Sequence, residues 1–152
     1  MTEDARFEDG RESPLNLGAE DADELKVISA LVQDAVLPAN EMQWRAKERR
    51  FALLLNRFRW EDGGKRPERV QSVLTIDEVT GVSSQGIDRK DKDMILSLLS
   101  VDFEAGEDGT GHILLTLAGD GVIRLSVEAL GASLKDVTRP YLAPSKSTPQ
   151  HE

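Results

Sequence analysis

A helical spacing of apolar residues marks the segment from residue 20 to residue 38. Its apolar positions recur at intervals of three and four, which places them along one face of a helix. Asp21 or Asp23 is the expected N-cap, and the acids beside it suit the positive end of the helix dipole. Pro38 is expected to end the helix, because proline cannot donate a backbone hydrogen bond. The apolar stripe comprises Leu25, Ile28, Leu31, Val32 and Ala35.

After residue 38 the period of the apolar positions falls to two, which is typical of β-strands. Gly119, Asp120 and Gly121 form the expected tight turn of a hairpin. The segment 131–137 is compatible with a strand end or a short helix. The strands that the alternation predicts are 42–47, 51–60, 70–86 (one strand, or two with a bend at Gly81), 95–103, 112–118 and 122–129.

These elements predict an α+β or mainly β fold, because one helix precedes an uninterrupted run of strands with hairpin-length links. We expect six or seven antiparallel strands. A long antiparallel sheet must cover or close its edges, so the expected form is a curled sheet or a partly open barrel of the pleckstrin-homology-like kind.

Both ends of the chain are expected to lie outside the fold. Residues 1–18 carry five acids and few apolar groups, which predicts a disordered acidic tail. Residues 140–152 contain three prolines among small polar residues, which predicts a second flexible tail. The folded domain is therefore expected to span residues 19–139. The polar start lacks the apolar run of a signal peptide, and no stretch is long enough to span a bilayer, so we expect a soluble, cytoplasmic protein.

Charge is distributed unevenly along the chain. The 152 residues include 19 basic and 28 acidic side chains, for a net charge of −9, which disfavours a general nucleic-acid binder. Residues 1–24 carry two bases and nine acids, whereas residues 41–69 carry nine bases and five acids. The segment 41–69 is therefore a local reversal of sign.

Strand alternation places several basic side chains of this segment on one face, which makes that face a candidate binding surface. Two predicted strands, 42–47 and 51–60, are separated by a turn near residues 48–50. If they form a hairpin, their basic side chains can converge on one surface, where guanidinium groups bind phosphates or carboxylates. An exposed aromatic residue among Trp44, Phe58 and Trp60 could stack a base or nucleotide ring. The alternative is a solvated face whose charges pair with nearby acids. The candidate residues are Arg45, Lys47, Arg49, Arg50, Arg57 and Arg59.

No catalytic or metal-binding pattern is evident. The only histidines are His112 and His151, and neither has an identifiable partner for a catalytic triad. The segment 81–86 resembles both a nucleophile elbow and a phosphate-binding loop but lacks the required spacing or lysine. The acids of loop 88–93 lack the spacing of a calcium loop and alternate with bases. Cysteine is absent from the chain, which excludes thiol chemistry. We expect no cofactor and no metal.

Several segments resemble a bacterial family of domains of unknown function that is known mainly from alphaproteobacteria. The resemblance covers roughly residues 24–136 and rests on QDAV, KERRFALLLNRF and QGIDR. It implies a shared fold but no activity and no site residues.

The sequence therefore favours a non-catalytic binding or scaffold domain that uses the basic strand face to contact a protein partner or a small anionic ligand. One alternative is a small-molecule enzyme that uses carboxylates and arginines. The other is a weak anion- or nucleic-acid-binding module, which the net charge disfavours. The oligomeric state is left open.

Overall fold

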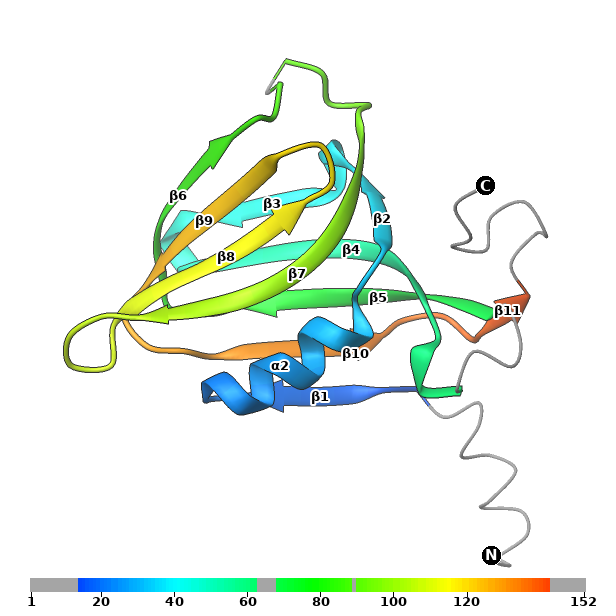
Figure 1. The fold of residues 1–152 in the computed structure, drawn as a ribbon, viewed down its shortest axis with the longest axis horizontal. Helices are drawn as coiled ribbons and strands as arrows, with labels where there is room; N and C mark the ends of the chain where they lie inside the picture. Colours follow the sequence, from blue (N-terminus) through cyan, green and yellow to red (C-terminus); the bar gives the residue numbers. More distant parts are fainter. Residues whose placement is uncertain (1–13, 63–67, 89, 143–152) are drawn as a thin grey trace, which may run out of the picture.

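Eleven strands form one curved antiparallel sheet beside a single helix in the computed structural model, which describes residues 14–62, 68–88 and 90–142 (Figure 1). The predicted tails lie mostly outside the described residues, at 1–13 and 143–152. The sheet nevertheless includes residues 16–18 and 141–142, which the sequence pattern assigned to the tails. Neighbouring strands follow the order β1 (Asn16–Ala19), β10 (Ala132–Asp136), β5 (Glu68–Ile76), β4 (Arg50–Phe58), β2 (Ala35–Pro38), β7 (Ile95–Ala105), β8 (Gly111–Leu117), β9 (Gly121–Val127) and β6 (Val79–Gln85).

Two short strands lie off this path. β3 (Met42–Arg45) pairs with the first half of β4, and β11 (Tyr141–Leu142) pairs with the start of β5. All pairs are antiparallel. The sheet curls but does not close, because β1 and β6 end the path without pairing with each other. The predicted curled antiparallel sheet is confirmed, but six or seven strands was too few.

The helix is shorter than the apolar spacing predicts. α2 spans Ala22–Leu31, and the Asp21 side chain caps it by accepting a hydrogen bond from the Glu24 N–H at 2.8 Å. The prediction that the helix continues to Pro38 was wrong. The backbone turns at Asp34, where φ is +64°, and residues 35–38 form β2 between β4 and β7. Buried Ala35 and Leu37 also follow a period of two, so tertiary pairing decides between the two patterns.

The strand boundaries follow the alternation closely elsewhere. The β8–β9 hairpin turns at Gly119 and Asp120, whose φ angles are +82° and +69°, as the Gly-Asp-Gly turn predicts. The bend between β5 and β6 lies at Asp77–Glu78 rather than at Gly81, which instead follows a register shift against β9. Residues 132–136 are a strand.

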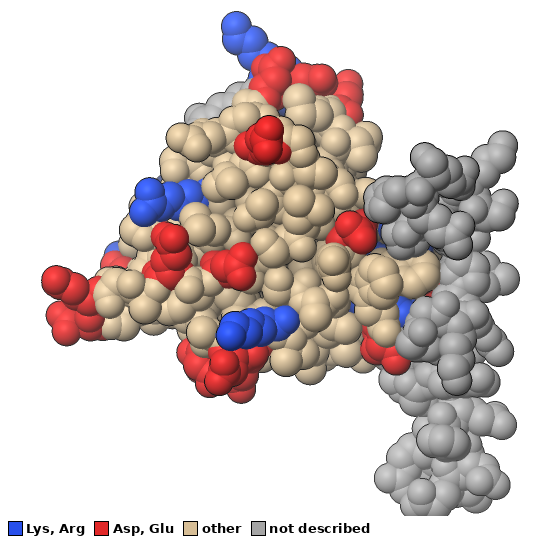
Figure 2. Space-filling model, in the orientation of Figure 1, with Lys and Arg blue, Asp and Glu red and all other residues tan. Residues whose placement is uncertain are grey.

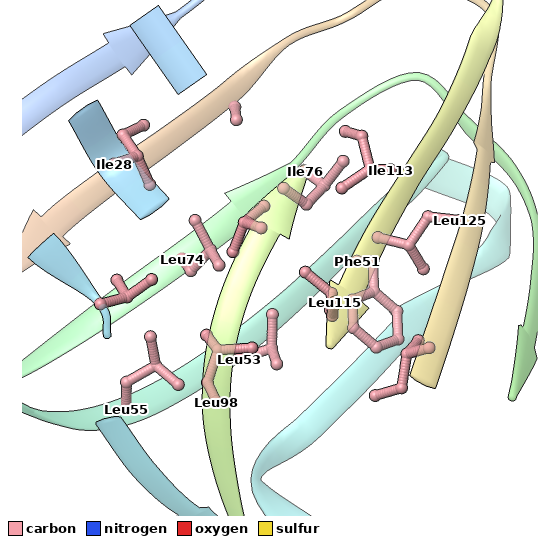
Figure 3. Close-up of a cluster of buried hydrophobic side chains, with 14 of the residues drawn as sticks. Ile28, Phe51, Leu53, Leu55, Leu74, Ile76, Leu98, Ile113, Leu115 and Leu125 are labelled. Atoms are coloured by element: carbon pink, nitrogen blue, oxygen red, sulfur yellow. The ribbon is translucent and has the colours of Figure 1, made fainter. Parts of the chain in front are cut away.

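The core lies inside the curl of the sheet, where the inward faces of β4, β5, β7, β8 and β9 meet (Figure 3). α2 covers one side and contributes Leu25 and Ile28, which are almost completely buried. Most strands contribute every second residue, as expected for a sheet with one buried face, whereas β7 changes phase at the register shift between Leu98 and Ser100. The labelled side chains of Figure 3 are Ile28, Phe51, Leu53, Leu55, Leu74, Ile76, Leu98, Ile113, Leu115 and Leu125.

Candidate functional site

The structure divides the six predicted basic residues into two groups. Arg45, Lys47, Arg49 and Arg50 surround the β3–β4 turn, which consists of a 3₁₀ turn at 46–48 followed by left-handed Arg49. Arg57 and Arg59 lie at the other end of β4, seven or more residues away. At about 3.3 Å per residue this separates the groups by roughly 23 Å along the strand. The six side chains therefore do not share one surface.

Three arginines of the β3–β4 turn form exposed ion pairs. Arg49 Nη1 contacts Glu128 at 2.8 Å, and Arg50 Nε contacts Asp77 at 2.9 Å. All four of these side chains are about half exposed. Arg45 lies 3.6 Å from Glu48 and donates to Gln43. Exposed pairs of this kind contribute little stability, typically below about 1 kcal/mol.

Arg57, in contrast, is completely buried, with 0% of its surface exposed. Its Nε donates to Ser72 Oγ at 2.9 Å, and its Nη2 donates to Asp136 Oδ1 at 3.0 Å. Glu61 accepts from Nη1 and Nη2 at 2.8 and 2.7 Å, in the paired geometry that suits guanidinium and carboxylate. Ser72 Oγ also donates to Asp136 Oδ1 at 2.6 Å. The Arg57 guanidinium is therefore saturated by the protein itself.

Burial would lower the pKa of Arg57, but its hydrogen bonds and ion pairs with Glu61 and Asp136 outweigh burial and raise it. Burial likewise would raise the pKa of Glu61, but the hydrogen bond from Arg57, a backbone hydrogen bond and the positive charges of Arg57 and Arg59 together outweigh burial and lower that pKa. Asp136 Oδ2 also accepts the Leu15 N–H at 2.9 Å, so the network anchors the chain just before β1. Arg59 lies beside this network, and its Nη1 donates to Glu68 Oε1 at 2.6 Å. This cluster holds β1, β4, β5 and β10 together.

One feature with the geometry of a ligand site is an opening in the curled sheet between β3 and β6. β3 pairs only with β4, and β6 pairs only with β9, so each leaves one strand edge unpaired within the described residues. The Val79 N–H donates to the Arg49 carbonyl at 2.9 Å and closes one end. At the other end the Asn40 N–H donates to Lys92 O at 3.0 Å, and the Ala39 N–H donates to Met94 O at 2.8 Å. We call this opening the β3–β6 window.

The window contains a cavity of about 470 Å³ with an apolar floor. Met42 and Trp44 lie opposite Leu53 and Phe51 of β4, which face the core, so both side chains lie on the inner face of the sheet. Trp44 is nevertheless 37% exposed. The described residues that line the cavity are Ala39, Asn40, Met42, Trp44, Phe51, Val82, Ser84, Ile87, Asp88, Asp91, Lys92 and Ile123.

Charged side chains reach the cavity from the loop between β6 and β7. Asp88, Asp91 and Lys92 line it there, and Asp88 Oδ1 accepts the Lys90 N–H at 2.9 Å. The loop is anchored at Gly86, whose φ is +73°. A Cβ at Gly86 would lie 2.8 Å from the carbonyl oxygen of Asp120, so glycine permits this close approach. The cavity thus has an apolar floor and a polar end that is fixed against the β8–β9 turn.

Other candidate features lie away from the window. His112 Nδ1 lies 3.3 Å from Arg124, and His112 does not line the window. No group of three or more acidic or histidine side chains in the described part of the chain could hold a metal ion. No helix among the described residues is long and apolar enough to cross a membrane. On the face in Figure 2, basic and acidic side chains are scattered among uncharged residues.

The sequence pattern contained a signal for the Arg57 cluster that the hairpin interpretation did not use. Phe51, Leu53 and Leu55 occupy one face of β4, and a period of two places Arg57 on that same buried face. Ser72 and Asp136 occupy core-facing positions of β5 and β10 in the same way. The window had no such signal, because it depends on which strand edges remain unpaired.

The chain matches the profile of a family described as a protein of unknown function, DUF2948, over residues 15–151. The chain belongs to the DUF2948 family. No curated protein and no solved structure gives a match. The DUF2948 match includes all described elements from β1 to β11, so both the Arg57 cluster and the β3–β6 window lie within the family domain.

Proposed function

We propose that this DUF2948 domain is a non-catalytic binding module and that its ligand site is the β3–β6 window. The observation that carries the proposal is Trp44, an inward-facing aromatic residue that is 37% exposed beside a cavity of about 470 Å³. Cavities of roughly 300–1,000 Å³ with apolar walls and a few polar groups are typical of small-molecule sites. The aromatic stacking role that the sequence suggested thus has a structural candidate in Trp44.

The absence of an oriented base among the lining residues supports binding rather than catalysis. The described lining contains no histidine that could act as a general base. We also propose that the protein is cytoplasmic and that its sheet is a pleckstrin-homology-like, partly open barrel. An apolar cavity beside an unpaired strand edge is what a partly open barrel can provide.

We also propose that a basic face contacts a second partner, but this face comprises only four of the six residues that the sequence suggested. Arg45, Lys47, Arg49 and Arg50 lie together at the turn that closes one end of the window, whereas Arg57 and Arg59 are buried and pair with acidic side chains. The exposed ion pairs of the turn are weak, so an anionic ligand or an acidic protein surface can replace Glu48, Asp77 and Glu128 at little cost. The net charge of −9 disfavours a general nucleic-acid binder, so the partner that we propose for this turn is a small anion or an acidic protein surface.

Filling the window is expected to weaken the binding of a neutral, planar, apolar dye. Val82 lines the cavity, whereas Ser83 lies on the opposite face of β6 and is exposed. We expect Val82→Trp to weaken the binding of Nile red at least tenfold, because the added indole occupies the cavity, and Ser83→Trp to leave it within about twofold. Dye fluorescence titrations at equal protein concentration measure both constants.

Two controls make this test specific. Circular dichroism and urea unfolding establish that Val82→Trp still folds. Arg45→Glu combined with Arg49→Glu is expected to leave dye binding within about twofold, because these side chains do not line the cavity. Equal dye affinity of Val82→Trp and the unmodified chain would show that the window is not the site.

A further inference from the structure

The two ends of the β3–β6 window differ in chemistry, and this difference selects a ligand class. At the end formed by the β6–β7 loop, Asp88 and Asp91 line the cavity together with one base, Lys92. Among the described residues, the lining side chains therefore carry two negative charges and one positive charge. The apolar floor of Met42, Trp44 and Ile123 lies beside this acidic end within the same cavity.

Trp44 determines the shape of the apolar part of the ligand. Aromatic rings favour offset or edge-to-face contact with an indole, and a cation over the ring face gains further attraction. Met42 also lines the cavity, and its thioether makes favourable contacts with ring edges. A planar aromatic group is therefore well matched to the floor.

The acidic end determines the charge of the polar part. An ammonium group can donate hydrogen bonds to the carboxylates of Asp88 and Asp91, whereas a carboxylate or phosphate on the ligand is repelled by both. Backbone hydrogen bonds hold this end in place, from the Asp91 N–H to Asp88 O at 3.1 Å and from the Asn40 N–H to Lys92 O. The loop backbone is thus positioned before a ligand arrives, which limits the ordering cost of binding.

We infer that the window binds a planar aromatic molecule that carries an amine, with the ring at Trp44 and the ammonium group at Asp88 and Asp91. This inference rests on the proposed function, since it names the ligand class of the same site. The basic turn does not oppose it. Arg49 contacts Glu128, Arg50 contacts Asp77, and neither arginine lines the cavity.

Three probes that share the indole ring system but differ in charge test the inference: tryptamine, indole and indole-3-acetate. The reporter is the ¹³C-labelled methyl group of Met42, assigned with Met42→Leu, with Met94, which does not line the cavity, as the internal reference. We expect all three to shift the Met42 methyl resonance and tryptamine to bind about tenfold more tightly than indole-3-acetate.

Charge variants at the acidic end provide the second measurement. Asp88→Asn combined with Asp91→Asn is expected to reduce the tenfold preference to within about twofold, and Lys92→Gln is expected to increase it. All three side chains are exposed, so the variants should keep the fold, which the Met94 resonance checks.

The possible outcomes distinguish an error in the ligand class from an error in the proposed binding site. If indole-3-acetate binds as tightly as tryptamine while both shift the Met42 resonance, the amine class is wrong and the window remains a binding site. If the double asparagine variant keeps the full preference, Asp88 and Asp91 are not its source and the inference is also overturned. If none of the probes shifts Met42, the result counts against the proposed function itself.

Discussion

Replacing Arg57 with methionine is expected to lower the free energy of unfolding by about 3–5 kcal/mol. The substitution keeps much of the side-chain volume but removes the donors that satisfy Ser72 and Asp136, whose side chains lie inside the sheet. A buried carboxylate without its cation costs far more than the net value of the original pair. Urea unfolding followed by circular dichroism measures the change.

Arg50→Met is the matched control, because it removes the same side chain from the same strand. Arg50 is half exposed and pairs with half-exposed Asp77, so we expect a much smaller loss than for Arg57→Met. Similar losses for Arg50→Met and Arg57→Met would contradict the assignment of Arg57 as the centre of a buried network.

Glu61→Gln is expected to lower stability by about 1–2 kcal/mol at pH 7, and this loss should disappear in acid. Arg57 lowers the pKa of Glu61 in the folded state below its ordinary value of 4.5. A lowered folded-state pKa contributes stability above the unfolded pKa, and this contribution is lost as the pH falls through the folded value. The difference between the two chains should therefore be constant above about pH 5, shrink below about 4.5 and vanish once folded Glu61 is protonated.

Urea unfolding of both chains between pH 7 and pH 3 measures this difference. The shape of the difference matters more than its size, since the Glu61 side chain is 27% exposed and solvent weakens its pair. A pH-independent difference would mean that the Glu61 carboxylate does not contribute through its charge.

The sequence predicts those parts of the fold that local patterns determine. Alternation locates β4, β7, β8 and β9, the Gly-Asp-Gly turn locates one hairpin, and Asp21 marks the start of the helix. β1 and β11 contain only four and two residues, too few for a period of two to be recognised. β2 was assigned to the helix because Ala35 satisfies both periods, and only pairing with β4 and β7 decides between them.

The candidate site was less predictable, because it depends on register and pairing. The hairpin of Arg45 and Arg50 was anticipated, but the burial of Arg57 depends on Ser72 and Asp136 lying opposite each other in β5 and β10. The alternation of Trp44 with Gln43 and Arg45 is typical of any edge strand, so it does not predict that Trp44 is exposed. Its exposure follows from the pairing of β6, which among the described residues pairs only with β9 and leaves the window open. No local pattern encodes this pairing.

The most direct test of the central claim is whether a bound ligand covers the inner face of β6. The chain contains no cysteine, so Val82→Cys and Ser83→Cys each introduce a single thiol, one lining the window and one on the opposite face. At a Nile red concentration ten times its dissociation constant, occupancy should slow alkylation of the window thiol about tenfold and leave the Ser83→Cys thiol unaffected. Equal alkylation rates at position 82 with and without bound dye would contradict the proposal that the β3–β6 window is the ligand site.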